Sequence, residues 1–300
     1  MGKRAAAQND ETFLGVLWDL LCGRLSPLLT VGFIILLILG VWVLARFFGE
    51  VPPTRIDAKN VALTPDPPVW IKSSDISGEV FATPELGEPL FFTSENLTEQ
   101  LANRFESHPW VRDVEKVQLH PPTNVTIKVE YRKPVLLGET EASILTPIST
   151  GCFRLPYKDF AEPAERRKYL RLLKVPRPTL PAVGQHWNDP YVLGAVRLAN
   201  ALRERYKVWN ITTIGAATPR SPQTEHLPHY QITTKNGTVI VWGLPPIDPN
   251  APNAEKLRQL AVLSTKEKIA CLDAYLKANG SLDHNQLRFD VVEIEVTPVE

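Results

Sequence analysis

An uninterrupted run of twenty residues without a charged side chain, Ser26–Ala45 (SPLLTVGFIILLILGVWVLA), constrains this 300-residue chain more than any other feature. As an α-helix the run would be about 30 Å long, which is the thickness of the hydrocarbon core of a bilayer. Pro27 suits the first turn of a helix, and Arg24 and Arg46 can reach headgroups at its two ends. The run therefore predicts a single N-terminal transmembrane helix over 26–48. A cleaved signal peptide is the alternative, but its apolar core is shorter.

The flanks of this run do not decide its orientation. Basic residues balance on the two sides under the positive-inside rule, with Lys3, Arg4 and Arg24 before the run and Arg46, Arg55 and Lys59 after it. Residues 1–25 are predicted to be a cytoplasmic or interfacial segment, in which Thr12–Leu25 is either an amphipathic interfacial helix or a helical lead-in. Residues 49–59 hold a proline pair and no apolar periodicity, which predicts a short, semi-rigid stalk.

The composition excludes several classes of protein. Equal numbers of basic and acidic residues, 33 each, leave no basic excess for a nucleic-acid binder. An apolar content of 44% and a charged content of 22% exclude wholesale disorder. Three cysteines are too few for a disulfide scaffold or a zinc cluster. Two alternatives remain open for Cys152 and Cys271: a disulfide bridge between them, or two buried free thiols.

Residues 60–138 carry the pattern of a small α+β module. The expected order is strand, helix, helix, strand, strand, with three strands covered on one face by two helices. The first helix is expected to be capped by Ser73 or Ser74 and the second by Ser94. The second helix repeats its apolar residues every four positions, at Leu97, Leu101 and Phe105. The three strands are expected at Asn60–Thr64, Val111–Leu119 and Asn124–Tyr131.

A proline–tryptophan–valine motif follows the second predicted helix, and a strand reading TIKVEYRKPV comes about 15 residues later. This ordered set resembles the POTRA domain of the bacterial cell-division family FtsQ/DivIB. The matching residues are Pro109, Trp110, Val111, Pro122, Arg132, Pro134 and Val135. From the residues alone, Trp110 is expected to fill the core at a helix–strand junction, and Pro134 to fix the exit of a strand.

Residues 139–297 resemble the second, β-rich domain of the same family, although the acidic turn residue expected after Ser143–Ser149 is missing. Asn236-Gly237, between two alternating runs, predicts a hairpin with a type I′ turn. Further helices are predicted at 163–174, from Asp189-Pro190 onward, and over 254–278 up to Gly280. The fold class expected for the whole chain is α+β: the transmembrane helix, the POTRA-like β-α-α-β-β module and an antiparallel β domain with flanking helices.

The last predicted strand, Gln286–Val296 (QLRFDVVEIEV), sets three apolar residues on one face and two glutamates on the other. It matches the family's terminal strand in either of two registers, through Leu287-Arg288-Phe289 or through Phe289–Val292. An unpaired strand edge can accept a strand from a partner, whereas an internal strand cannot. The candidate partner-binding residues are Arg288, Phe289, Val292, Ile294 and Val296. The candidate structural residues are Pro109, Trp110, Pro134, Asn236 and Gly237.

The sequence shows no motif for a catalytic nucleophile, a phosphate loop or a zinc protease. Its six histidines are scattered, and His226 and His229 lie in a proline-flanked loop. We therefore expect no enzyme activity, no metal, no cofactor, no small-molecule ligand and no nucleic acid. The alternative is a membrane-tethered enzyme, or a POTRA-containing secretion or transport component.

The resemblance implies a non-enzymatic, single-pass scaffold of the cell inner membrane. Its N-terminus would be cytoplasmic and its folded domains periplasmic. Its expected partners are the lipid bilayer and other single-pass division proteins of the FtsB/FtsL type, bound by strand addition.

Overall fold

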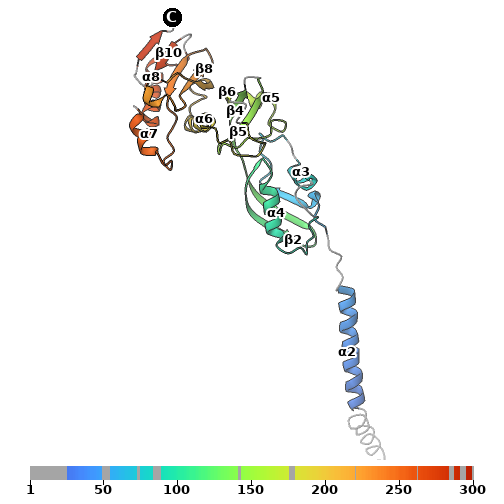
Figure 1. Ribbon diagram of the computed structural model, residues 1–300. Helices are drawn as coiled ribbons and strands as arrows, with labels where there is room; N and C mark the ends of the chain where they lie inside the picture. Colours follow the sequence, from blue (N-terminus) through green and yellow to red (C-terminus); the bar gives the residue numbers. More distant parts are fainter. Residues whose placement is uncertain are drawn as a thin grey trace, which may run out of the picture. The chain divides into compact units, whose positions relative to one another are not determined.

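The computed structural model describes residues 26–48, 55–72, 75–83, 89–140, 143–175, 180–219, 221–261, 263–283, 287–290 and 295–298. The predicted N-terminal segment 1–25 and the first part of the predicted stalk lie outside these ranges. The chain divides into two compact units, Met1–Thr54 and Arg55–Glu300. Figure 1 shows helix α2 in the first unit and all strands in the second.

Helix α2 spans Ser26–Phe48. Among the described residues, however, no helix is both long enough and apolar enough to cross a membrane. The transmembrane helix in the predicted fold class is corrected accordingly.

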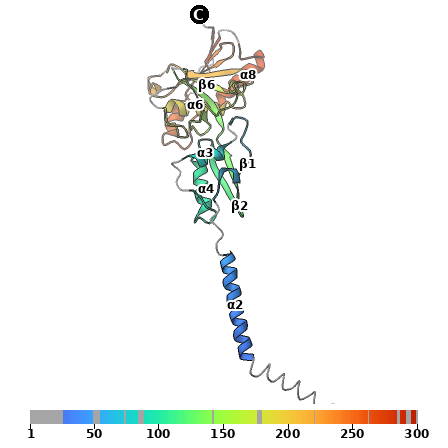
Figure 2. The same ribbon diagram turned by 90° about the vertical axis from the view of Figure 1, so that its right-hand side faces the viewer.

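The second unit begins with a three-stranded sheet in the order β1-β3-β2. Strand β1 runs parallel to β3, and β2 runs antiparallel to it. Helices α3 and α4 precede β2 in the chain and lie against this sheet (Figure 2). The elements occur in the predicted order, and their bounds are Val61–Thr64 (β1), Ile76–Ala82 (α3), Leu97–Glu106 (α4), Val111–His120 (β2) and Asn124–Tyr131 (β3).

The apolar faces of these elements form one core. Leu97, Leu101 and Phe105 of α4 are buried against it, as their four-residue spacing predicts. The predicted caps differ, because Asp75 accepts a hydrogen bond from Gly78 N–H at the start of α3 and Asn96 occupies the cap position of α4. Ser73 and Ser74 lie outside the described residues.

The second part of the predicted stalk is folded rather than extended. Ile56 is buried in the core of the small sheet, and its N–H donates to the carbonyl of Leu90 at 2.9 Å. A short 3₁₀-helix, Ala58–Asn60, then leads directly into β1. Residues 56–59 of the predicted stalk therefore belong to the folded unit.

Residues from beyond the small sheet complete its core. Phe160 is fully buried there, and its ring stacks on Trp110 with centroids 6.3 Å apart. Two backbone hydrogen bonds join the segment around Phe160 to the loop between β1 and α3: Lys72 N–H donates to Asp159 O, and Ala161 N–H donates to Trp70 O. The two sheets are therefore joined by a shared apolar contact within one unit.

The larger sheet has eight strands in the order β11-β10-β9-β8-β7-β6-β4-β5. It is mixed and not antiparallel as predicted, because β4/β6, β6/β7 and β9/β10 are parallel pairs. Parallel neighbours need a crossover connection, and helices lie in all three connections of this sheet. The strands are Pro134–Thr140 (β4), Leu145–Ser149 (β5), Leu170–Val175 (β6), Ile211–Ala216 (β7), Tyr230–Thr234 (β8), Val239–Gly243 (β9), Leu287–Asp290 (β10) and Glu295–Pro298 (β11).

Two predicted helices have different bounds in the structure. Residues 163–174 form only a one-turn helix, α5 (Pro163–Arg166), before the chain turns into strand β6. The helix predicted over 254–278 is split into α7 (Ala254–Leu260) and α8 (Thr265–Asn279). The split occurs where Ser264 and Glu267 form a capping box, which starts a new helix. A short 3₁₀-helix, Pro222–Thr224, lies between β7 and β8.

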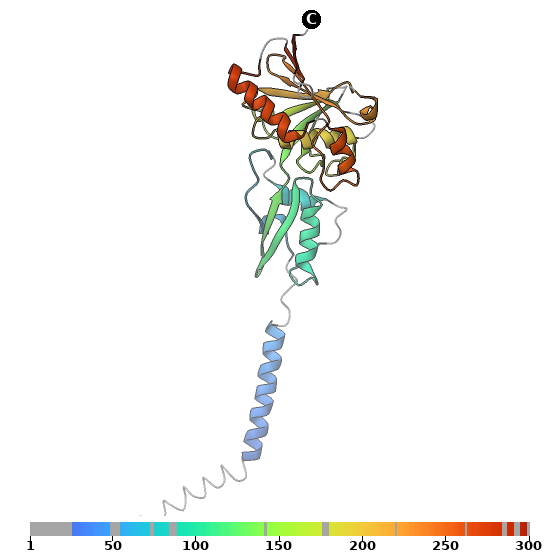
Figure 3. The same cartoon turned by 90° about the vertical axis from the view of Figure 1, so that its left-hand side faces the viewer.

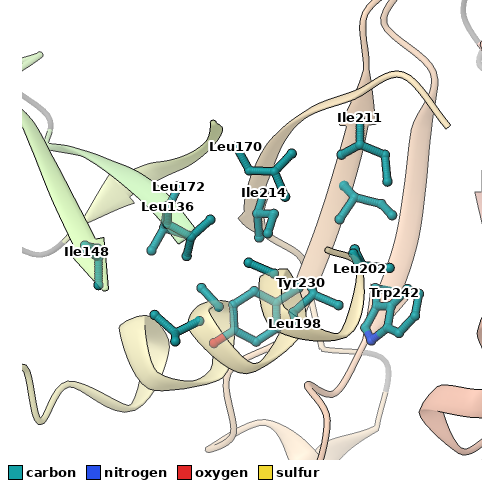
Figure 4. Close-up of a cluster of buried hydrophobic side chains, with 14 of the residues drawn as sticks. Leu136, Ile148, Leu170, Leu172, Leu198, Leu202, Ile211, Ile214, Tyr230 and Trp242 are labelled. Carbon is teal, nitrogen blue, oxygen red and sulfur yellow. The ribbon is translucent and has the colours of Figure 1, made fainter. Parts of the chain in front are cut away.

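Helix α6 (Pro190–Ala201) begins at the predicted cap, because the side chain of Asp189 accepts from the N–H groups of Tyr191 and Val192. It packs on the same core as α8, which also covers the large sheet (Figure 3). Figure 4 shows Leu198 of α6 beside Tyr230 and below the strands. The absence of a side chain at Gly194 lets Tyr230 approach α6 and donate to Tyr191 O at 2.6 Å.

Candidate partner-binding edge

The predicted terminal strand Gln286–Val296 is two strands in the structure. Strand β10 pairs with β9 in parallel, with Phe289 opposite Ile240, and with β11 in antiparallel, with Phe289 opposite Val296. Strand β11 is the last in the sheet order, and among the described residues it pairs only with β10. The open edge of the large sheet is therefore β11.

The chain entering β10 is held at two points. Gly280 ends α8 with a positive φ of 76°, which turns the chain back toward the sheet. Leu282 is then buried in the large core. Asp283 Oδ1 accepts hydrogen bonds from Thr234 Oγ1 and, at 2.8 Å, from Asn236 N–H. These contacts set the start of the terminal hairpin against strands β8 and β9.

The turn between β8 and β9 is not the predicted type I′ turn. Only Gly237 has a positive φ, 93°, whereas a type I′ turn needs positive φ at both central residues. Gly237 N–H donates to Thr234 O at 3.2 Å, and Thr234 N–H donates to Thr238 O at 3.0 Å. The turn is therefore a hairpin loop longer than the two-residue type, and its last residue is a glycine with a positive φ.

The other sheet edges are covered, charged or short. The outer side of β5 receives the following segment, in which Leu155 N–H donates to Pro147 O at 2.9 Å. The outer strand of the small sheet, β2, has two register irregularities and a series of exposed charged side chains. Strand β1 has four residues and is followed by Pro65. Irregularities, charges, prolines and short length all discourage strand pairing. Strand β11 shares its four-residue length and a proline with β1, and it is the candidate edge because it forms the outer strand of the predicted terminal segment.

The structure distributes the predicted partner-binding residues over different environments. Arg288 and Phe289 belong to β10, whose backbone is occupied on both sides. Val296 belongs to the edge strand β11. Val292 and Ile294 lie outside the described residues. Sequence reasoning missed the anchoring residues Leu282 and Asp283, which carry no motif beyond their position just after the glycine that ends α8.

The predicted structural residues lie at the junction of the two sheets and at the hairpin. Trp110 is fully buried, and its carbonyl accepts from Arg132 N–H at 2.8 Å. Pro109 lies against Gly184, where a Cβ would come within 3.3 Å of its ring. Pro134 opens β4 opposite Ser149. Asn236 and Gly237 form the turn that Asp283 contacts.

The described residues include several titratable groups whose surroundings bear on their chemistry. No group of three or more metal-ligating side chains occurs among the described residues. His229 Nε2 lies 3.2 Å from the carbonyl of Thr224. Cys152 and Cys271 are both free, and burial raises the pKa of the Cys152 thiol to about 12. A thiol with such a pKa is a poor nucleophile at neutral pH.

One buried cation stands apart from these groups. Lys268 of α8 is 4% exposed, and its Nζ donates to the carbonyl of Trp242 at 2.6 Å. Burial lowers the pKa of this amine to about 8. The contact joins α8 to the end of β9, so its role is to fix the helix beside the strand that carries the terminal hairpin.

No protein-family model matches this chain, and no curated protein matches it.

Proposed function

We propose that this chain is a non-enzymatic scaffold of the bacterial cell-division machinery that recruits other division proteins by strand addition at β11. Its place of action is the extracytoplasmic side of the cell inner membrane, beside partners of the FtsB/FtsL type. The observation that carries the proposal is the open edge of an eight-stranded sheet, at a hairpin that is anchored by Leu282 and Asp283.

The geometry suits recognition through the backbone. A partner strand placed beside β11 gains main-chain hydrogen bonds, and its alternating side chains meet the two faces of the sheet. The edge is short, Glu295–Pro298, and Pro298 has no N–H to offer. A short edge with a glutamate and a proline limits pairing between copies, while a chosen partner can still add contacts elsewhere.

The resemblance of residues 109–135 to the POTRA domain of the FtsQ/DivIB family supports the division context. The order β1-α3-α4-β2-β3 and the burial of Trp110 are in keeping with that resemblance. The scaffold role rests on the edge strand, and the division role rests on the motif.

The test compares two substitutions at one position of the edge strand. Val296→Pro removes a backbone N–H from β11 and disfavours strand pairing, whereas Val296→Ala keeps the backbone intact. We expect Val296→Pro to abolish co-purification of division proteins and enrichment of a fluorescent fusion at the division site. Val296→Ala should retain both, and circular dichroism should show that both variants are folded.

Two results would contradict the proposal. Co-purification that survives Val296→Pro in the folded protein would show that partners bind elsewhere. A wild-type fusion spread evenly over the cell envelope would remove the division role, while leaving open strand pairing with other proteins.

A further inference from the structure

A second surface of the same unit carries a concentration of positive charge that strand addition does not explain. Two adjoining cavities, of about 370 and 740 Å³, share a wall formed by Lys168, Tyr169, Tyr206 and Lys207. We call the two cavities together the basic groove. Its basic lining residues are Lys133, Arg167, Lys168, Arg171, Arg203, Lys207 and Lys235.

The charge of the basic groove departs sharply from that of the whole chain. Seven basic side chains line it against one acidic residue, Glu165, whereas the chain has 33 of each. Lys168 pairs with Glu165, and Arg171 lies 3.8 Å from Glu139. The other five have no acidic partner among the described residues: Lys133, Arg167, Arg203, Lys207 and Lys235. Like charges held this close attract an anionic ligand.

The folding of the chain creates this concentration from distant segments. Lys133 precedes β4, Arg171 lies on β6, Lys207 follows α6 and Lys235 lies in the β8–β9 turn. Strands β6 and β7 pair in parallel, so the start of β6, which carries Arg171, lies near the segment before β7, which carries Lys207. Lys235 lines the same cavity as these two residues. Four separate stretches of chain therefore contribute cations to one surface.

The spread of these cations indicates an extended ligand. The five unpaired side chains are all exposed and come from both cavities, so they do not converge on a single point. The lining also includes the aromatic residues Trp70, Tyr169 and Tyr206, and Val69, which is 82% exposed. An extended chain that alternates carboxylates with apolar side chains would satisfy both features.

We propose that the basic groove binds an acidic, extended peptide segment of a partner protein, with carboxylates on the cations and an apolar side chain against the tyrosines. Strands β8, β9 and β10 separate β7 from β11, which places the basic groove about 19 Å from the open edge across the sheet. The two surfaces can therefore hold different segments. This inference does not depend on strand addition.

The test measures binding of a fluorescein-labelled twelve-residue peptide of alternating glutamate and leucine to the full chain by fluorescence anisotropy. The groove variant carries Arg203→Glu, Lys207→Glu and Lys235→Glu. The matched control carries Lys116→Glu, Lys256→Glu and Lys266→Glu, three exposed lysines outside the basic groove with the same change in net charge.

We expect the groove variant to bind at least about tenfold more weakly, which corresponds to about 1.4 kcal/mol, and the control to bind within about twofold of wild type. Binding should also weaken at 0.5 M salt, because exposed charges are screened. Equal weakening in both variants, or no binding by the wild type, would overturn the proposal. Equal or tighter binding of a twelve-nucleotide single-stranded DNA, or of vesicles with 30% phosphatidylglycerol, would also overturn it.

A second measurement uses the unsubstituted chain, so it does not depend on the variants folding. Carbodiimide joins peptide carboxylates to nearby lysine amines, and mass spectrometry locates the joined residues. We expect cross-links at Lys133, Lys168, Lys207 and Lys235. Cross-links spread evenly over lysines outside the basic groove would contradict the proposal.

Discussion

Phe160 is one of the buried side chains from beyond the small sheet that complete its core, and Phe160→Ala tests this contribution. Phe160 is fully buried, stacks on Trp110 and meets Tyr169 edge to face with centroids 5.1 Å apart. Truncation of a buried phenylalanine costs about 3–5 kcal/mol, a range that includes the cavity left behind. Phe160→Ala also removes the two ring contacts, and we expect the free energy of unfolding to fall by about 4 kcal/mol.

The assay is urea unfolding of the full chain followed by tryptophan fluorescence, to which Trp110 contributes. For a slope of about 2–3 kcal/mol per molar urea, the midpoint should fall by about 1–2 M. Val208→Ala is the matched control, because Val208 is 63% exposed and its truncation should cost less than about 0.5 kcal/mol. A loss below about 1 kcal/mol for Phe160→Ala would refute the claim that this residue completes the core of the small sheet.

Three further substitutions test single contacts. Asp283→Ala should lower stability by about 1–3 kcal/mol and speed amide exchange in β10, since it removes the acceptor of the buried Thr234 hydroxyl and of the exposed Asn236 N–H; unchanged exchange would show that Asp283 does not anchor β10. Gly194→Ala should destabilise by about 1–3 kcal/mol in thermal unfolding despite the better helix propensity of alanine, because the added Cβ clashes with Tyr230 Oη; higher stability would disprove this close approach. Burial holds the pKa of Lys268 at about 8, below its usual 10.5, so the unfolded chain binds more protons between these values. Stability should rise by about 2 kcal/mol from pH 7 to 9.5 relative to Lys268→Met, and equal pH profiles for the two proteins would exclude this burial effect.

Local patterns predicted the small sheet well because its signals are local. Asn124–Tyr131 alternates apolar and polar residues without interruption, and strand β3 has these bounds. Asp189-Pro190 carries its own cap, and α6 begins there. In both places the residues that determine the element are the residues inside it.

Elements that depend on distant partners were predicted wrongly. Leu170, Leu172 and Leu173 fit either a helical stripe or a strand, and pairing with β4 and β7 decides in favour of β6. The prediction that the large sheet is antiparallel was wrong for the same reason, because the strands that pair in parallel are far apart in sequence. The single terminal strand was likewise replaced by a hairpin, β10 and β11, whose order in the sheet no local pattern reports.

The two candidate surfaces also differ in whether local sequence patterns could predict them. The position of a terminal edge strand was within reach of sequence reasoning, since alternation near the C-terminus indicates a strand. The basic groove was not, because its cations come from four separated segments and a net charge of zero conceals them.

The central claim is that a partner strand pairs with β11, and amide hydrogen exchange of the full chain measures this most directly. Successive amides of an edge strand face opposite sides, so only some of those at Glu295, Val296 and Thr297 face away from β10. With a co-purified partner bound, exchange at the outward-facing amides should slow by at least about tenfold, because they become hydrogen-bonded. Unchanged exchange at these three residues, in a complex that protects another surface, would contradict strand addition at β11.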